Sequence, residues 1–473
     1  MSSVPDWLES MDERVGVGIA SFLFGIIGFL GLFSPEGLGY VDGWYHLART
    51  ELLLSDPASF FSQSFEALQF TTLSETYADL HWGYRVLLAP FTLFGVNGFL
   101  VGHLFIVTCL GGYLYWSLRQ RSPVWAPYLT ALVLTTPYWA MRLTMPRSIA
   151  LGGLLFLVFS DLLLQGRWKA LAVFSTVSVW MYTSWIFGVL ALGAYIVSSY
   201  VAGSGVSWRT VAASCSGFVA GLIVNPFFPS NLVVTWQQVV SFLFVDVAVG
   251  TEWKAPTQDM WIELGFAGLV LVLSVFSISP RRLRREELFW FGLVATFGVL
   301  SVLSRRSIFY FVLSVALLAA STNLRMGLPK RKLLEALLIV GICLGIIMSV
   351  TTVRSDSTYL HRLENCLPAI NGGFDDDAVL HNVWWDEFPY LYRHTDKQYT
   401  VGLDPRFTAL VESRLASSLL PGGERPRVDA FDSLGIDGVV GIRGRPYSFE
   451  EPLRESNAAK EVFRDATCYV YRV

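Results

Sequence analysis

Charged side chains are scarce in this sequence. Lys, Arg, Asp and Glu together make up 15% of its 473 residues, whereas hydrophobic residues make up 53% and the mean hydropathy is +0.48. Soluble domains carry about 25% charged residues, so the composition excludes an ordinary soluble protein. The net charge of −3 and the lack of a polybasic tract give no indication of a nucleic-acid partner. We therefore expect a polytopic α-helical membrane protein.

Basic residues are also lacking at the start of the sequence. The first residues, MSSVPDWLESMDER, have no basic segment of the kind that opens a signal peptide, so we expect the first apolar run to be retained as a span. Apolar runs near the length of a membrane-crossing helix predict about eleven spans. They lie at residues 15–34, 97–117, 124–140, 148–165, 170–183, 186–203, 211–224, 259–279, 287–303, 307–321 and 333–350. The runs around WMYTSW also fit one interrupted helix, and GYRVLLAPFTLFGV (83–96) is expected to be interfacial or re-entrant.

Arginine and lysine are sparse in every second loop. One set of loops is rich in both, with RRLRREE at 281–287 and RMGLPKRK at 325–332, and the opposite set has few. The positive-inside rule places the rich set in the cytoplasm. We therefore expect an integral plasma-membrane protein with a cytoplasmic N-terminus and an external C-terminal region. The loops that contain DGWYHLAR, MRLTMPRS, TEWKAP and SRR all fall on the external face.

The scarcity of charge ends near Thr352. Beyond it the composition is ordinary, with short β-like runs, YTVGL and GVVGI, and a helix start at LDPRF, where Asp404 is suited to the cap and Pro405 to the first turn. We predict a multi-span membrane domain at 1–351, with a first external loop at 35–83, and an exported α/β domain at 352–473, which is of ordinary domain size.

Cysteines are few, five in all. Three of them, Cys109, Cys215 and Cys343, lie in predicted spans and are expected to be inert. Cys366 and Cys468 flank the exported domain and would pair in an oxidising compartment. Two free thiols are an equally good expectation from the sequence.

The first external loop carries the most prominent polar cluster. Asp42 opens DGWYHLAR directly after the first predicted span. Trp44 and Tyr45 fit an interfacial aromatic belt, and an aspartate there can cap the next helix. Alternatively, Asp42 is a general base toward an acceptor hydroxyl or amide at the membrane surface. The same loop also carries Asp79 and His81, and a loop of this length indicates a function.

Two further external segments carry carboxylates. Glu252 lies in VGTEWKAPTQDMW, where it is either an ordinary loop acid or part of a site. In HNVWWDEFPYLYR, Trp384 and Trp385 precede Asp386. Adjacent tryptophans beside a carboxylate form either a strand-end core or a recognition pocket for a polar acceptor.

These segments resemble, in the same order, motifs of the oligosaccharyltransferase catalytic subunit and its archaeal relatives, which belong to the type-C (GT-C) glycosyltransferase superfamily. DGWYHLAR is similar to D-P-W-Y-H-x-R, GTEWKAP to S-V-x-E-x-x-P, and WWDEF to W-W-D-Y-G. The matching positions are Asp42, Trp44, Tyr45, His46, Thr251, Glu252, Pro256, Trp384, Trp385 and Asp386. Gly43 replaces a proline, and Glu387 and Phe388 depart from the third motif. SRRSIFYFVLSVALLAA (304–320) is similar to the family's late span with an arginine at its start.

The resemblance implies a GT-C fold and a sugar donor on a polyprenyl-phosphate carrier, used outside the membrane. Where the family has an acidic pair that helps to hold a divalent metal, this sequence reads MRLTMPRSIALGG, without an acid. A Mg²⁺ or Mn²⁺ ion prefers more carboxylates than Asp42 and Glu252 supply, which argues against a metal requirement. Arginines bind phosphate through paired hydrogen bonds, so a donor monophosphate held by arginines is at least as good an expectation as a metal-bound pyrophosphate.

The sequence thus predicts a membrane glycosyltransferase that moves a sugar from a polyprenyl-phosphate-type carrier to an acceptor on the external face. Its partners are membrane lipids, the lipid-linked sugar and an acceptor that is a protein, a glycan or a lipid. The predicted site comprises catalytic Asp42 and Glu252, phosphate-binding Arg142, Arg147, Arg305 and Arg306, and acceptor-binding His46, His81, Trp384, Trp385 and Asp386.

Two other functional classes fit part of the sequence. A flippase or transporter for lipid-linked substrates is expected to have ionisable residues near the bilayer midplane and broken helices. Most predicted spans lack such residues, although an interrupted helix at WMYTSW would favour transport. A non-catalytic membrane scaffold explains the topology, but it does not explain why separate loops bring carboxylates and arginines to one face.

Overall fold

The computed structural model describes residues 41–240, 256, 258–277, 284–322, 360–412, 415, 428–445 and 449–473. The chain divides into two compact units. The helical unit comprises Met1–Phe33, Leu100–Leu222 and Thr251–Ser355, and the mixed unit comprises Ser34–Phe99, Ile223–Gly250 and Asp356–Val473. The predicted boundary between residues 351 and 352 stays a prediction, and the first-loop segment groups with the C-terminal segment.

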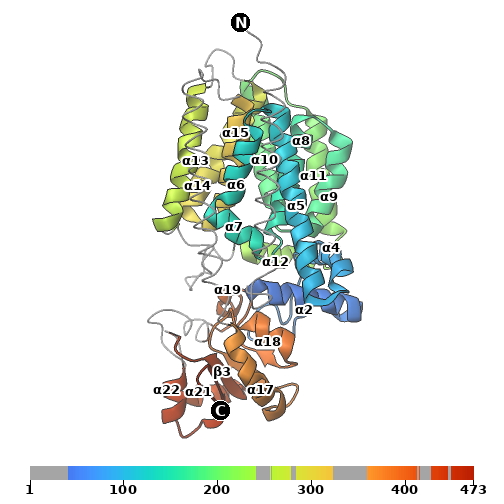
Figure 1. The fold of residues 1–473 in the computed structure, drawn as a ribbon. Helices are drawn as coiled ribbons and strands as arrows, with labels where there is room; N and C mark the ends of the chain where they lie inside the picture. The colour runs from blue at the N-terminus through green and yellow to red at the C-terminus, as the bar shows by residue number, and fades with distance from the viewer. Residues whose placement is uncertain are drawn as a thin grey trace. The chain divides into compact units, whose positions relative to one another are not determined.

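The helical unit is a bundle of apolar helices (Figure 1). Its described helices are α5 Gly95–Arg121, α6 Ala126–Thr135, α7 Pro137–Thr144, α8 Ile149–Leu164, α9 Trp168–Met181, α10 Trp185–Val201, α11 Trp208–Ile223, α13 Gln258–Ser277, α14 Arg285–Leu303, η3 Arg305–Ser307 and α15 Ile308–Thr322. Every residue of α15 is buried, and α15 packs against α6, α13 and α14, so it forms the centre of the bundle.

Length and composition allow three described segments to cross a membrane: Gly95–Arg121, Arg285–Leu303 and Arg305–Thr322. Three shorter helices, Ala126–Thr135, Ile149–Leu164 and Trp185–Val201, are also apolar. Each predicted span between 97 and 321 coincides with helical structure, and the predicted spans at 15–34 and 333–350 lie outside the described residues.

One predicted span, 124–140, is divided into two helices. α6 ends at Thr135, Thr136 leaves the helical conformation with φ −57° and ψ 121°, and α7 begins at Pro137. A residue before proline is disfavoured in the α conformation, whereas proline is favoured in the first helical turn. Thr136–Pro137 therefore ends one helix and starts the next.

The WMYTSW segment is a turn between antiparallel helices. α9 ends at Met181 and Tyr182 is extended. A Cβ on Gly152, near the start of α8, would contact Tyr182 and Ser184, and one on Gly188 would contact Phe159, about two turns further along α8. α10 therefore runs along α8 from the end where α9 stops, which excludes the interrupted-helix alternative.

Two glycines bring α9 and α11 into close contact. A Cβ on Gly217 would collide with the carbonyl oxygen of Ala172, and one on Gly221 would lie 2.6 Å from that of Thr176. The side chains of Thr176 and Trp180 donate hydrogen bonds to the Gly217 and Gly221 carbonyls, at 3.1 and 2.9 Å. Small residues four apart are a common device for close helix packing in membranes.

The mixed unit contains a five-stranded sheet and short helices. The strands are β1 Val379–Asn382, β2 Gln398–Tyr399, β3 Gly438–Ile442, β4 Lys460–Arg464 and β5 Cys468–Arg472, in the order β2-β1-β3-β5-β4. The β2, β1 and β3 strands are parallel, while β5 is antiparallel to both β3 and β4. The strand predicted at GVVGI is confirmed as β3. At YTVGL (399–403) only Tyr399 lies in a strand, because β2 ends there and residues 400–403 leave the extended ladder.

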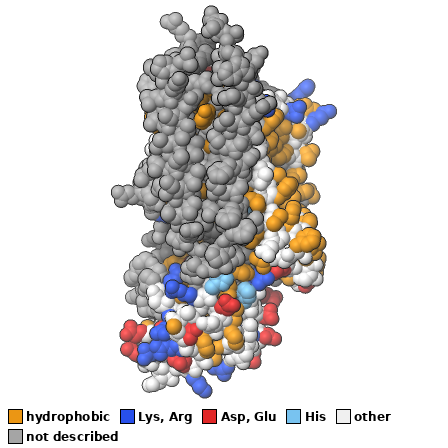
Figure 2. Space-filling view, viewed as in Figure 1, with side chains coloured by type: hydrophobic (Ala, Val, Ile, Leu, Met, Phe, Trp, Pro, Cys, Tyr) orange, Lys and Arg blue, Asp and Glu red, His pale blue; other side chains and the backbone are white. Residues whose placement is uncertain are grey.

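The helices of the mixed unit are α2 Val41–Ser55, α3 Pro57–Phe60, α4 Trp82–Thr92, α12 Ser230–Val239, η4 Leu360–Cys366, α17 Leu367–Gly373, α18 Phe388–His394, α19 Pro405–Ala409, α21 Val428–Ser433 and α22 Glu450–Glu455. The predicted cap is confirmed: Asp404 accepts a hydrogen bond from the Arg406 N–H, and Pro405 begins α19. On the face shown in Figure 2, the charged side chains gather on the part that contains the sheet, and the visible described side chains of the helices are mainly hydrophobic.

The segment predicted to be interfacial forms α4, which has 11 residues and is too short to span. Tyr84 and Leu88 are fully buried within the unit. Its other face exposes Val86 and Leu87, and the turn that follows exposes Phe94, which is 80% accessible. A helix with one buried face and one exposed apolar face fits an interfacial position.

Cys366 and Cys468 form a disulfide that joins η4 to β5, with a sequence separation of 102. Cross-linking so long a loop restricts the unfolded chain, and removing such a bridge typically costs about 2–5 kcal/mol. We expect Cys366→Ser/Cys468→Ser to lower the unfolding free energy of the C-terminal segment that contains the sheet by about this amount. Protease resistance of the full chain along a urea series measures it. Cys215→Ser, at an exposed free thiol, should leave the midpoint unchanged.

Candidate functional site

Helix α2 carries the first-loop motif on one face. Asp42, Tyr45, His46 and Arg49 have the i, i+3, i+4, i+7 spacing that aligns side chains along a helix. Asp42 lies in the first helical turn, where the helix dipole favours a carboxylate, and it is half-buried. Tyr45, His46 and Arg49 are buried. On this face of α2, Asp42 is therefore the partly accessible side chain, and the three residues that follow it along the face are packed in the interior.

Trp44 attaches α2 to α18. Its ring packs edge-on against Tyr390 and His394, with centroids 5.4 and 5.3 Å apart, and the Arg393 guanidinium lies 5.4 Å from its centroid. Arg393 also pairs with Glu51 at 3.0 Å. Trp44 and Tyr45 are each only 7% exposed, which argues against the aromatic-belt interpretation. The packing of α18 on α2 brings the DGWYHLAR and WWDEF segments into one unit.

The two first-loop histidines with a predicted acceptor role are neighbours. The rings of His46 and His81 have centroids 5.6 Å apart, and His46 also meets Tyr84 edge-on at 5.2 Å. His46 is 4% exposed, whereas His81 is half-buried. Of the two, His81 is better placed to reach an acceptor.

Under α2 lies a cluster of buried charges that the sequence did not single out. Asp79 pairs with Nη1 of Arg85, and its Oδ2 lies 3.7 Å from Nε of Arg49. All three side chains are at least 97% buried. Burial alone would raise the pKa of Asp79, but Arg85 and Arg49 outweigh it and hold that pKa below its usual value. Asp79 is therefore an internal ion-pair residue.

The WWDE segment lies at the carboxyl ends of β1 and β3. The backbone N–H groups of Trp384 and Ile442 donate hydrogen bonds to the two carboxyl oxygens of Glu387, at 3.2 and 3.3 Å. Half-buried Asp386 lies 4.0 Å from Arg445. Glu387, a departure from the family motif, thus fixes the loop that presents Trp384, Trp385 and Asp386.

Glu387 predicts a specific pH dependence of stability. Burial, together with the Asp386 charge, raises the pKa of this 1% exposed group from 4.5 to about 8. Between these values the folded state holds a proton that the unfolded state has lost, so stability falls as pH rises. The decrease is on the order of 3–5 kcal/mol.

Thermal unfolding of the full chain at pH 5 and pH 8 tests this expectation. Glu387→Gln removes the titration and should flatten the slope, although the amide loses one of the two backbone hydrogen bonds and lowers stability at both pH values. Glu451→Gln, at an exposed position in α22, should keep the wild-type slope. An unchanged slope in Glu387→Gln would contradict the assignment.

The four predicted phosphate-binding arginines lie in the helical unit. Arg142 is buried in α7, Arg147 is half-buried before α8, and Arg305 and Arg306 are half-buried in η3. Arg306 interacts electrostatically with Tyr310, at the start of α15. Asp42 belongs to the mixed unit and Glu252 lies outside the described residues, so the convergence of carboxylates and arginines stays a prediction.

In the part of the chain that the structure describes, no group of three His, Cys, Asp or Glu side chains is arranged to hold a metal ion. Glu252 lies outside the described residues, so the suggestion that Asp42 and Glu252 share a metal ion stays a prediction.

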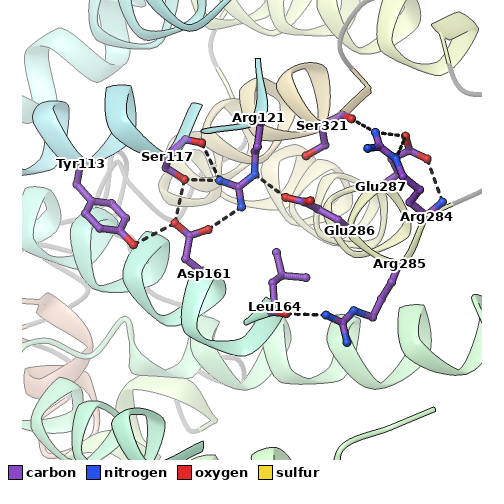
Figure 3. Close-up of polar contacts among 10 residues, drawn as sticks. All are labelled: Tyr113, Ser117, Arg121, Asp161, Leu164, Arg284, Arg285, Glu286, Glu287 and Ser321. Atoms are coloured by element: carbon purple, nitrogen blue, oxygen red, sulfur yellow. Dashed lines mark hydrogen bonds and ion pairs between the residues drawn. The ribbon is translucent and has the colours of Figure 1, made fainter. Parts of the chain in front are cut away.

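A second polar network in the helical unit was also missed from the sequence (Figure 3). Asp161 accepts hydrogen bonds from Tyr113, Ser117 and Arg121, at 3.0, 2.9 and 2.6 Å. Arg121 also pairs with Glu286 at 2.6 Å. The network ties together the C-terminal end of α5, the C-terminal end of α8 and the N-terminal end of α14.

The chain has the fold of solved type-C membrane glycosyltransferases. The chain is similar to ArnT from Cupriavidus metallidurans, solved with bound undecaprenyl phosphate, with TM-score 0.61 and 14% identity over 99% of this chain and 98% of that one. This likeness, together with the apolar helices, identifies an integral membrane protein with this fold.

Two further solved structures share the fold. The Archaeoglobus fulgidus oligosaccharyltransferase, tethered to an acceptor peptide, gives TM-score 0.61 and 11% identity over 90% of this chain and 69% of its own. The mycobacterial arabinofuranosyltransferase AftD gives 0.57 and 14% over 97% of this chain and 41% of its own. No protein-family model matches the sequence, and no curated protein matches it.

Proposed function

We propose that the protein is a glycosyltransferase that moves a sugar from a polyprenyl-phosphate carrier to an acceptor at the external membrane surface. The observation that carries the proposal is the half-buried Asp42 in the first turn of α2, in a chain whose fold is shared along its whole length with an undecaprenyl-phosphate-binding transferase. The disulfide between Cys366 and Cys468 supports an oxidising, external location for the C-terminal segment.

In this reaction the Asp42 carboxylate accepts the proton of an acceptor hydroxyl or amide. The acceptor atom then attacks the anomeric carbon of the sugar, and the bond between that carbon and the phosphate oxygen breaks. Negative charge develops on the departing phosphate, where preorganised cations stabilise it most. We assign that role to Arg142, Arg147, Arg305 and Arg306. Glu252 positions the acceptor, and His81, Trp384, Trp385 and Asp386 shape the surface on which it docks.

Two features of the helical unit favour this proposal over transport. The WMYTSW segment is a turn between antiparallel α9 and α10, so it does not supply the broken helix that many transporters use. The Asp161–Arg121–Glu286 network lies at helix ends, whereas transporters typically have their ionisable residues near the bilayer midplane.

Donor cleavage tests the proposal without knowledge of the acceptor. The full chain in liposomes is incubated with undecaprenyl-phospho-[¹⁴C]sugars, pentose and hexose in turn, and with a solubilised membrane extract as acceptor source. We expect release of undecaprenyl phosphate and transfer of label out of the lipid fraction for at least one sugar. Movement of intact donor across the bilayer without cleavage would contradict the transferase proposal and support a flippase function instead.

A further inference from the structure

We infer that the buried Arg49–Asp79–Arg85 triad is a positioning element that fixes the rotation of α2 and so aims Asp42 at its substrate. The inference rests on the proposed function, because it gives Asp42 the catalytic role. Asp79 joins Arg49 on α2 to Arg85 on α4, and the loop between these helices supplies Asp79 itself. One carboxylate thus connects all three segments.

The triad is held by aromatic rings as well as by charge. The Arg49 guanidinium lies 4.7 Å from the Phe60 ring centroid and 5.1 Å from that of Tyr77, and it donates a 2.7 Å hydrogen bond to the Phe60 carbonyl. The Arg85 guanidinium lies 5.1 Å from the Tyr45 centroid. Tyr45 and Tyr77 are joined by a 2.8 Å hydrogen bond between their hydroxyls. These contacts all act on the face of α2 that carries Asp42.

Stability alone does not account for this cluster. Two buried cations share one buried anion, and Nε and Nη2 of Arg85 are buried with no hydrogen-bond partner among the residues that the structure describes. Apolar side chains of similar volume commonly serve stability as well as, or better than, a buried ion pair. Charge adds a preference for one position of α2. Asp79 lies between two specific guanidinium groups, and sliding or rotating α2 moves the Arg49 guanidinium away from the Asp79 carboxylate.

Helix geometry links the triad to Asp42. Arg49 follows Asp42 by seven residues, about two turns, on the same face of α2. A side-chain end lies roughly 6 Å from the helix axis, so a rotation of about 20° displaces the Asp42 carboxylate by about 2 Å. Misplacing a catalytic group by about 1 Å can lower a rate about 100-fold. A small rotation of α2 is therefore sufficient to disable Asp42 while binding groups elsewhere remain in place.

The first test is Asp79→Asn in the donor-cleavage assay, with the undecaprenyl-phospho-[¹⁴C]sugar that the wild-type protein cleaves. We expect kcat to fall about 10–100-fold, with KM for this donor within about twofold of wild type. Glu450→Gln is the matched control, because Glu450 also pairs with two arginines, Arg443 at 2.8 Å and Arg464 at 2.6 Å. Glu450 belongs to α22, in the C-terminal segment that contains the sheet. Its kcat should remain within about twofold of wild type.

A second variant separates positioning from folding. Asp79→Leu/Arg85→Met replaces the closest ion pair by apolar side chains of similar volume, so it leaves one buried guanidinium, that of Arg49, without its carboxylate, whereas Asp79→Asn leaves two. We expect its thermal midpoint to recover relative to Asp79→Asn while kcat stays at least 10-fold below wild type. Recovery of kcat together with the midpoint would overturn the inference, because the triad would then be structural only. This variant decides the matter even if Asp79→Asn fails to fold.

A readout independent of catalysis distinguishes this inference from the proposed function. In a background with Cys109, Cys215 and Cys343 changed to serine, Asp42→Cys reports the accessibility of that position to maleimide. Adding Asp79→Leu/Arg85→Met should change its labelling rate several-fold; an unchanged rate would show that α2 has not rotated. If labelling changes but Asp42→Asn remains active, the proposed function fails and the link between the triad and α2 remains.

Discussion

Replacing Asp42 by asparagine is expected to lower donor cleavage by about 10²–10⁴-fold, the usual contribution of a general base. The amide has nearly the shape of the carboxylate but cannot accept the acceptor's proton at neutral pH. The effect on folding should be small, because the interaction of a first-turn carboxylate with the helix dipole is worth about 0.3–1 kcal/mol. Expression, membrane insertion and thermal midpoint should therefore stay close to wild type while activity is lost.

Glu51→Gln is the matched control for Asp42→Asn. Glu51 lies on the same helix, is 39% exposed at its side chain, and pairs with Arg393 at 3.0 Å. Exposed ion pairs are worth about 0–1 kcal/mol, so this variant should retain activity within about twofold. An Asp42→Asn protein that cleaves the donor at the wild-type rate would remove the catalytic assignment and leave Asp42 as a helix-start residue. Loss of activity in both variants would point to damage to α2 as a whole.

The helices of the bundle were predictable because hydropathy is a local property. Runs of apolar residues predicted helical structure at every described span, and Asp404–Pro405 correctly predicted the start of α19. The failure at 124–140 arose from giving hydropathy more weight than Pro137, whose ring disfavours the helical conformation of Thr136. The turn at WMYTSW was ambiguous for a related reason: its residues are apolar enough to continue a helix.

The candidate site was less predictable, because burial is a property of the tertiary structure. Trp44 matched both an interfacial belt and a motif, and only the packing of α18 on α2 shows that it is a core residue. Asp79 was noted as one more loop acid, and nothing local indicates that Arg49 and Arg85 enclose it. Glu387 departs from the family motif, and nothing local in the sequence indicates that its carboxyl group turns inward to accept two backbone hydrogen bonds.

The second large effect is expected at the phosphate-binding arginines of η3. Arg305 and Arg306 are half-buried at the start of the segment that leads into fully buried α15, so their backbone is held by the centre of the bundle. A charge-assisted hydrogen bond to a phosphate is worth about 1.5–3 kcal/mol. Arg306→Gln should therefore lower kcat/KM for donor cleavage about 10–100-fold, and Arg305→Gln/Arg306→Gln should lower it further.

Three comparisons make this last prediction specific to phosphate. Arg306→Lys keeps the charge but loses the planar pair of donors, so its activity should lie between those of wild type and Arg306→Gln. Arg209→Gln, at an exposed position in α11, should behave as wild type. Binding of undecaprenyl phosphate alone should weaken in parallel with kcat/KM, because the same oxygens carry the charge in product and transition state. If the double variant binds and cleaves the donor normally, Arg305 and Arg306 do not bind the phosphate. The role would then belong to Arg142 and Arg147, or to residues other than arginine.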